Sequence, residues 1–490
     1  MNIIDASEAL IEQVLEQSYD AFFTYRSTTP SQRKQLLSTI AKLIEEARVE
    51  LVAVAAKETH LPETRLNNEL NRTIFQLESY GAACLKGYWM EASIDHDESA
   101  QPAKPTIRKL LIPLGPVVVF GSSNFPFAYS TAGGDTASAL AAGCTVVIKA
   151  HPAHPETSSR MASCIAEAVA LCGLPAGVFQ HVFGASHQVG KWLVQHPHTA
   201  AVGFTGSFTG GKQLVDWAAA RHQPIPVFAE MGSLNPVFIL PEKLNREYAQ
   251  IANQLVGSYT LGVGQFCTKP GVIIGIESPA WTFLLNELSA LTSQVKSAPL
   301  LHEGIAASYK KNCEEVLLQP GVRVLAQGNS STNPEDGNAM MIHVSADDWL
   351  SNKYLQAENF GPFTIAVQCK NAEQLIAIAK QIEGQLTGTI YGTEEELADY
   401  ALLISWIETR CGRLIFNGVP TGVEVCKSMQ HGGPFPATSD ARFGAVGEDA
   451  IRRFLRPLAY QNWPDSLLPA ALQEKNPLTI PRFVNGKIHY

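Results

Sequence analysis

The chain has 490 residues, too many for a single compact core, and 46% of them are apolar and 17% charged. This composition is typical of a folded protein with two or three domains. The net charge of −9 and the lack of a basic stripe argue against a nucleic-acid partner. Because the sequence shows no long apolar run and no signal-peptide pattern, we expect a cytoplasmic protein with no membrane partner.

The first hundred residues are predicted to be mainly helical. Thr29, Pro30 and Gln32 follow the order of a capping box with proline at the first helical position. Apolar residues then recur at a helical period through 36–44, which predicts an amphipathic helix.

Beyond a polar stretch at 95–106, short apolar runs alternate with helical segments. The predicted strands are 117–120, 146–148, 178–182, 201–204 and 227–229. The helices expected between them lie near 127–142, 156–171, 186–195 and 207–220. Each helix is long enough for a right-handed crossover, so the pattern predicts a parallel, doubly wound sheet. Such sheets most often bind nucleotides.

The same alternation then continues and predicts a second α/β domain. Its expected strands are 237–240, 272–274 and 364–367, and its expected helices lie near 243–261, 279–293 and 372–382. One more strand is weakly indicated at 453–456.

Three polar residues stand at the ends of predicted strands, where a doubly wound sheet binds its ligands. Asn124 is either a helix cap or a donor to a developing oxyanion. Lys149 is either a surface lysine or a cation for a ribose or phosphate, and Glu230 is either a solvated acid or a general base. Taken singly, each residue leaves both interpretations open.

The segment 203–213 contains a glycine pattern that resembles a phosphate loop. Gly206 to Lys212 fits the spacing, but Gln213 stands where a kinase or ATPase needs Ser or Thr for magnesium, so we reject that interpretation. What remains is Gly206-Ser207 at a helix N-terminus, where backbone N–H groups can meet a pyrophosphate.

Nine cysteines are scattered without any Cys-x-x-Cys pair, which argues against disulfides and against a metal site. One of them, Cys267 in the stretch 264–268 (GQFCT), lies on a loop predicted just before a strand. There a side chain can project into a cleft. By itself this cysteine could be a buried thiol or a nucleophile.

The ordered set of these motifs, followed by 358–362 (ENFGP), resembles the aldehyde dehydrogenase superfamily over nearly the whole chain. Within it, the chain is most similar to the NADP-dependent branch of 2-oxoglutarate semialdehyde (2,5-dioxopentanoate) dehydrogenases and bacterial long-chain aldehyde dehydrogenases. The segments that carry this narrower resemblance are 132–140, 149–155, 264–271 and 430–436.

The resemblance implies an α/β, aldehyde dehydrogenase-like fold with three parts. A dinucleotide-binding domain is expected at 1–94 and 114–230, with a catalytic domain at 231–440. An oligomerisation element with the C-terminal tail is expected at 95–113 and 441–490. A homodimer or homotetramer is implied.

The resemblance also implies catalytic roles. Cys267 would attack an aldehyde, while Asn124 and the backbone N–H of Cys267 would hold the resulting oxyanion. Glu230 would activate the water that hydrolyses the thioester. His431 is either a turn or core residue, or a proton acceptor close to the nucleophile.

On the cofactor side, the implied contacts reach the adenosine ribose, the pyrophosphate and the nicotinamide ribose. They come from Lys149, His151, Pro152, Gly206, Ser207, Glu358 and Phe360. Many NAD-preferring relatives carry a glutamate where this chain has Pro152. Without that carboxylate a 2′-phosphate is tolerated, so NADP is favoured and NAD stays open.

The expected substrate is 2-oxoglutarate semialdehyde, which would be oxidised to 2-oxoglutarate. A long-chain or generic aliphatic aldehyde is the first alternative, because an apolar tunnel lined by Phe125, Phe127, Tyr129 and Phe266 suits either substrate. A basic residue near the tunnel mouth would favour the carboxylated aldehyde. An inactive binding or structural relative is the remote alternative.

Overall fold

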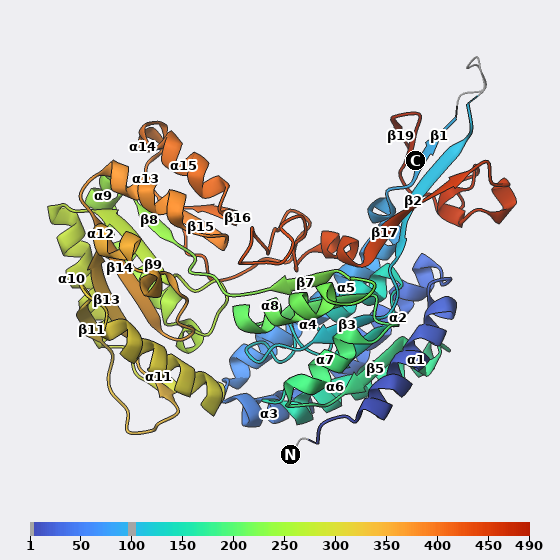
Figure 1. Ribbon diagram of the computed structural model, residues 1–490, viewed down its shortest axis with the longest axis horizontal. Helices are drawn as coiled ribbons and strands as arrows, with labels where there is room; N and C mark the ends of the chain where they lie inside the picture. Colours follow the sequence, from blue (N-terminus) through green and yellow to red (C-terminus); the bar gives the residue numbers. More distant parts are fainter. Residues whose placement is uncertain (1–3, 97–103) are drawn as a thin grey trace.

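One sheet of parallel strands and one sheet of mainly parallel strands form the two halves of the molecule. A third sheet projects from the first half as an arm (Figure 1). The computed structural model describes residues 4–96 and 104–490. Residues 97–103, within the expected element 95–113, lie outside the described residues.

The first half is built on a five-stranded, all-parallel sheet with the strand order β5-β4-β3-β6-β7. Its strands are β3 (Val117–Phe120), β4 (Val146–Lys149), β5 (Phe179–Val182), β6 (Ala201–Thr205) and β7 (Val227–Glu230). The order reverses between β3 and β6, which is the crevice where doubly wound sheets bind ligands. The predicted doubly wound sheet is therefore confirmed.

Helices cover this sheet on both faces. The crossover helices are α5 (Gly134–Ala142), α6 (Pro155–Leu171), α7 (His187–Gln195) and α8 (Phe208–Ala219). The preceding helices are α1 (Glu8–Tyr25), α2 (Pro30–Glu46), α3 (Arg48–Thr59) and α4 (Glu63–Lys86). The capping box expected at Thr29 and Gln32 is present at the start of α2.

The second half contains a seven-stranded sheet in the order β11-β13-β14-β9-β8-β15-β16, in which only the edge strand β11 is antiparallel. Its strands are β8 (Val237–Ile239), β9 (Val272–Ile276), β11 (Arg323–Gln327), β13 (Met340–Ser345), β14 (Phe363–Cys369), β15 (Gln385–Tyr391) and β16 (Cys411–Phe416). Its helices are α9 (Pro241–Tyr259), α10 (Pro279–Ser293), α11 (Glu303–Leu317), α12 (Ala346–Ser351), α13 (Ala372–Gln381), α14 (Glu394–Asp399) and α15 (Ala401–Glu408). A separate small ladder pairs β10 (Ala298–Pro299) with β12 (Asp336–Gly337).

The arm is a five-stranded sheet in the order β17-β2-β1-β18-β19. Its strands are β1 (Ser93–Asp95), β2 (Ile107–Pro113), β17 (Leu455–Gln461), β18 (Arg482–Val484) and β19 (Lys487–His489). It extends beyond the first half in Figure 1, and the weak strand indication at 453–456 corresponds to the start of β17. Within residues 4–96 and 104–490, no helix combines the length and apolar character needed to cross a bilayer.

The helix expected near 127–142 is too long, because α5 begins only at Gly134. A Glu69 carboxylate oxygen accepts the backbone N–H groups of Phe127 and Ala128, at 2.7 and 3.0 Å. The carbonyl of Ala128 in turn accepts from the backbone N–H of Gly134 at 3.0 Å. These bonds hold 126–133 as turns, so Asn124 does not cap a helix.

Candidate active site

Four of the predicted site residues meet at one edge of the first sheet. Asn124, Lys149, Gly206 and Glu230 stand at or just after the carboxyl ends of β3, β4, β6 and β7. Because these strands are parallel, their carboxyl ends share one edge, beside the point where the strand order reverses.

The loop that carries Cys267 runs directly into β9, as predicted. Gly264 has φ +67°, and a Cβ on it would lie 2.2 Å from the Gly361 carbonyl oxygen, so only glycine fits there. The fully buried Asn235 donates its side-chain amide to the carbonyls of Cys267 and Lys269, at 2.8 and 3.0 Å. The turn at Gly264 before the cysteine and the Asn235 amide bonds at and after it therefore fix the backbone on both sides of Cys267.

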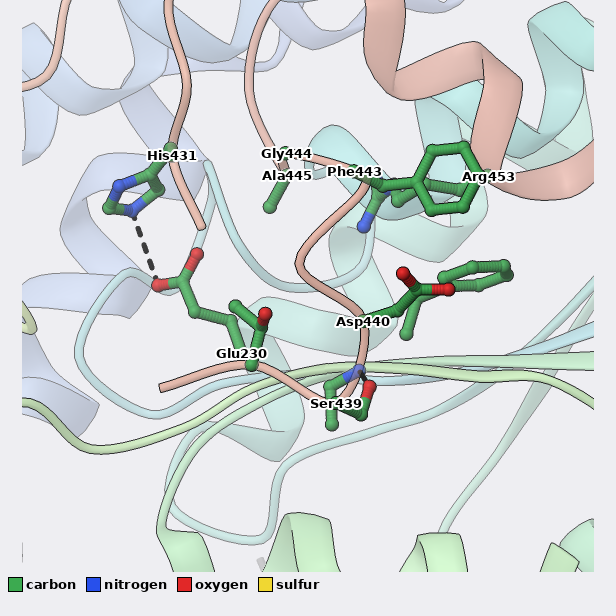
Figure 2. Close-up of a pocket in the computed structure, with 11 residues that line it drawn as sticks. Glu230, His431, Ser439, Asp440, Phe443, Gly444, Ala445 and Arg453 are labelled. Carbon is green, nitrogen blue, oxygen red and sulfur yellow. Dashed lines mark hydrogen bonds and ion pairs between the residues drawn. The ribbon is translucent and has the colours of Figure 1, made fainter. Parts of the chain in front are cut away.

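Cys267, His431 and Glu230 converge although they come from distant parts of the chain. His431 Nε2 lies 3.6 Å from Cys267 Sγ and 3.2 Å from Glu230 Oε1, the contact drawn as a dashed line in Figure 2. The His431 and Glu230 side chains are 2% and 3% exposed. The contact to Oε1 brings an imidazole nitrogen close to a carboxylate oxygen. It leaves both Glu230 oxygens without an aligned hydrogen-bond donor in the described part of the chain.

His431 reaches this position because its segment returns to the first half. The backbone N–H of Met231 donates to the Ala437 carbonyl at 2.8 Å, and Glu230 forms an isolated antiparallel bridge with Thr438. The residues just after His431 therefore pair with the end of β7. This geometry favours the interpretation of His431 as a residue beside the nucleophile over its interpretation as a distant turn residue.

The charges around Cys267 oppose ionisation of its thiol. Burial raises the pKa of Cys267 well above its usual range, and the negative charges of Glu230 and Glu358 raise it further. Arg72 acts in the opposite direction. The resting side chain is therefore a neutral thiol, and a base must remove its proton before it can attack.

Two donors suited to an oxyanion lie beside the sulfur. The Asn124 side-chain amide donates one N–H to the Gln265 carbonyl at 3.1 Å, which leaves its second N–H for another acceptor. Within the described residues, the backbone N–H of Cys267 makes no hydrogen bond. Arg65 fixes the Asn124 backbone by donating to its carbonyl at 2.8 Å.

A small cavity of about 20 Å³ adjoins Glu230 and His431 (Figure 2). Asp440 and Arg453 also line it, so its walls carry both acidic and basic groups. Such a polar volume is large enough for a single water molecule.

The predicted cofactor residues lie along the same sheet edge. Gly206 and Ser207 are exposed at the N-terminus of α8, where Ser207 Oγ accepts from the Gly210 N–H at 3.2 Å. Burial lowers the pKa of Lys149 to about 8, although nearby Asp5 acts to raise it. His151 follows at the end of β4, with Pro152 exposed beside it.

Glu358 lies next to the turn that follows Glu230. A Cβ on Gly232 would lie 2.3 Å from Glu358 Oε2, which explains the glycine at this position. Burial raises the pKa of Glu358 to about 7, while the charge of Lys269 acts in the opposite direction. Phe360 is half-buried in the same loop.

Lys269 is a supporting residue that the sequence did not indicate. It is 1% exposed, and its ammonium group donates to the carbonyls of Asn359 and Phe363 at 3.0 and 2.8 Å. These two bonds span the loop that carries Glu358 and Phe360. Asn235 was also missed, because its contacts with the cysteine loop form only in the folded chain.

The thiol, imidazole and carboxylate also form a donor set that fits a metal ion. Their ligand atoms in Cys267, His431 and Glu230 all lie within 4.8 Å of one another. This mixture of sulfur, nitrogen and oxygen donors suits Zn²⁺.

A thiol beside an imidazole and a carboxylate, together with two oxyanion donors and a dinucleotide-type sheet, is the arrangement expected of an NAD(P)-dependent oxidoreductase. A sequence profile of the Aldehyde dehydrogenase family matches residues 1–439. The chain therefore belongs to the aldehyde dehydrogenase family, which confirms the predicted family and fold.

Two relatives are each 43% identical to this chain. Alpha-ketoglutaric semialdehyde dehydrogenase 2 of Azospirillum brasilense aligns over 98% of this chain and 92% of its own length. Alpha-ketoglutaric semialdehyde dehydrogenase of Acinetobacter baylyi aligns over 97% and 91%. Among solved structures, glyceraldehyde-3-phosphate dehydrogenase GapN of Methanocaldococcus jannaschii, in complex with NADP, superposes with a TM-score of 0.78. It is 20% identical and is matched over 94% of this chain and 95% of its own.

Proposed function

We propose that this enzyme oxidises 2-oxoglutarate semialdehyde to 2-oxoglutarate, with NADP as the hydride acceptor. The observation that carries the reaction type is the convergence of Cys267, His431 and Glu230 beside the Asn124 amide. The substrate is supported by the two relatives named for the same semialdehyde, which this chain matches over nearly its whole length.

In the acylation half, His431 Nε2 accepts the thiol proton across 3.6 Å and lies 3.2 Å from Glu230, which can receive it. The Cys267 thiolate then adds to the aldehyde carbon and forms a thiohemiacetal. The free N–H of Asn124 and the backbone N–H of Cys267 stabilise its oxyanion.

The chain also offers the groups that a nicotinamide cofactor requires. Lys149, with His151 and Pro152, would hold the adenosine ribose and its 2′-phosphate. Gly206 and Ser207 would meet the pyrophosphate, and Glu358 with Phe360 the nicotinamide ribose. When bound, the cofactor accepts the hydride that leaves as the thiohemiacetal becomes a thioester.

In the deacylation half, Glu230 removes a proton from a water molecule that attacks the thioester carbon. The carbon–sulfur bond breaks, the carboxylic acid leaves and Cys267 regains a proton. The polar cavity beside Glu230 and His431 is a suitable source for this water.

The test is an aldehyde panel assayed with both cofactors. The enzyme should use 2-oxoglutarate semialdehyde with a higher kcat/KM than hexanal or dodecanal, and NADP with a higher kcat/KM than NAD. Cys267→Ala serves as the control and should form no reduced cofactor. A strong preference for dodecanal would favour a long-chain aldehyde dehydrogenase instead.

We further propose a cytoplasmic homodimer or homotetramer that assembles through the arm. Its strands β1, β2 and β17 carry exposed side chains on a sheet that projects beyond the first half (Figure 1). Sedimentation of the purified enzyme would distinguish these two states from a monomer.

A further inference from the structure

Two arginines from opposite halves of the molecule meet at the loop that follows β16, and one of them, Arg72, also contacts Tyr129. Arg72 lies on α4 of the first half, and Arg413 lies on β16 of the second half. Arg72 Nη2 donates to the Tyr129 hydroxyl oxygen at 3.2 Å, and its guanidinium carbon lies 5.7 Å from the centre of the Tyr129 ring. Tyr129 in turn lies 6.1 Å from the His431 ring, measured between ring centres.

Both arginines also hold the loop that follows β16. Arg413 donates to the carbonyls of Pro420 and Gly422, at 2.6 and 3.0 Å. Arg72 donates through Nη1 to the carbonyl of Val423. The main hydrogen-bond partners of the two guanidinium groups here are uncharged carbonyl oxygens. These bonds fix the position of each guanidinium group but do not neutralise its positive charge.

The charges of these arginines act on the nucleophile. Burial raises the pKa of both Cys267 and Tyr129, and the positive charge of Arg72 opposes this rise in each of them. Cys267 and Tyr129 in turn act to raise the pKa of Arg413, which burial lowers. Both guanidinium groups are therefore within electrostatic range of the sulfur.

One acid partly balances this positive charge, and two N–H groups remain without acceptors. Glu69, between Arg65 and Arg72 on α4, is committed through one oxygen to the backbone of Phe127 and Ala128. Among the described residues, buried Arg72 Nε and Arg65 Nη1 have no hydrogen-bond acceptor. A buried arginine donor without a partner costs free energy, which an anionic ligand would recover.

We propose that Arg72 and Arg413 bind the carboxylate at the far end of the aldehyde substrate. This inference rests on the proposed function and deepens it, because it assigns the chemistry that selects the substrate. Guanidinium groups bind a carboxylate through charge-assisted hydrogen bonds, whereas they offer nothing to the methyl end of a fatty aldehyde. The aromatic wall of Phe125, Tyr129 and Phe266 would enclose the carbons between the two ends.

Arg65 has a different task at this site. Its guanidinium group lies over the rings of Phe125 and Phe266, at 5.2 and 4.8 Å from their centres, and donates to the Asn124 carbonyl. It therefore positions the aromatic wall and the oxyanion donor, and it is not used as a variant below.

The test compares two aldehydes of equal length, 5-oxopentanoate and pentanal. Arg72→Gln and Arg413→Gln should each lower kcat/KM for 5-oxopentanoate roughly 10- to 150-fold more than kcat/KM for pentanal, mainly through KM. Arg72→Lys should recover part of the loss, because lysine keeps the positive charge but lacks the planar guanidinium group that can donate two hydrogen bonds to one carboxylate. Arg246→Gln, on an exposed face of α9, is the matched control and should leave both values unchanged.

A second measurement needs no variant. Pentanoate should slow alkylation of Cys267 by iodoacetamide in the wild-type enzyme, and 1-pentanol should not. The inference is overturned if pentanoate gives no protection. It is also overturned if the wild type prefers 5-oxopentanoate and both glutamine variants keep that preference, or if they lose pentanal activity equally. A wild type without any preference for the carboxylated aldehyde would instead contradict the proposed substrate.

Discussion

Replacing Glu230 by glutamine removes one negative charge from beside the nucleophile and nearly preserves the size of the side chain. The reacting atoms of Glu230 and Cys267 lie within 4.8 Å. At this distance a pair of unit charges interacts by ~3.5 kcal/mol at an effective dielectric constant of about 20, and by ~0.9 kcal/mol in water. Because the charge of Glu230 raises the pKa of the Cys267 thiol, its removal should lower that pKa.

The assay is the pH dependence of Cys267 alkylation by iodoacetamide, with mass-spectrometric identification of the modified residue. In Glu230→Gln the midpoint should move to lower pH, while Glu8→Gln, at the exposed start of α1, leaves it in place. The same variant should give one burst of reduced cofactor followed by slow turnover, because acylation survives and deacylation fails. An unmoved or raised midpoint would refute the charge argument, and undiminished steady turnover would refute the role of Glu230 in hydrolysis.

Five further outcomes are expected. Lys269→Met should weaken NADPH binding roughly tenfold, measured by fluorescence titration, because two hydrogen bonds across the cofactor loop are lost. Wild-type cofactor affinity should rise as the pH increases through about 7, where Glu358 becomes the carboxylate that accepts ribose hydroxyls, and the Lys269 variant should shift this rise to higher pH. Asn235→Ala should lower the free energy of unfolding in urea by roughly 2–3 kcal/mol, because two buried carbonyls lose their donor. Pro152→Glu should lower the ratio of kcat/KM for NADP over NAD about tenfold or more, since the added carboxylate repels a 2′-phosphate. Zn²⁺ should inhibit reversibly by binding the thiolate of Cys267, whereas EDTA alone should leave turnover unchanged.

The first sheet could be predicted because its strands are uninterrupted apolar runs. Residues 117–119 and 146–148 are buried on both faces of the sheet. A strand buried in this way requires an uninterrupted run of apolar residues, and that run can be recognised in the sequence. The strand ends then indicated where Asn124, Lys149 and Glu230 would meet. These positions follow from topology alone, without any knowledge of side-chain contacts.

The second sheet was harder to predict because one of its buried strands carries polar residues. In β15, Gln385 accepts hydrogen bonds from the Ser233 hydroxyl and from two backbone N–H groups, and Thr387 donates to Asn235. Apart from the Glu383 carbonyl, which accepts from the Gln385 amide, the partners of these side chains lie about 150 positions away, so the local sequence pattern does not mark a strand. The basic residues of the proposed substrate site escaped prediction for the same reason, since Arg72 and Arg413 come together only at the loop 420–423 of the folded chain.

The two halves of the reaction make opposite demands on one carboxylate. In the proposed mechanism Glu230 is left protonated after acylation if it receives the thiol proton from His431, whereas deacylation requires it to be ionised so that it can take a proton from water. Acylation itself removes part of this conflict. The negative charge of Glu230 disfavours the Cys267 thiolate, but the sulfur of the thioester carries no charge. The proton must still leave Glu230 between the two steps, and Asp440 lines the same small cavity as Glu230 (Figure 2). Burial and the charges of Glu230 and Glu358, which together raise the pKa of Cys267, account for a thiol that rests neutral beside the base it needs.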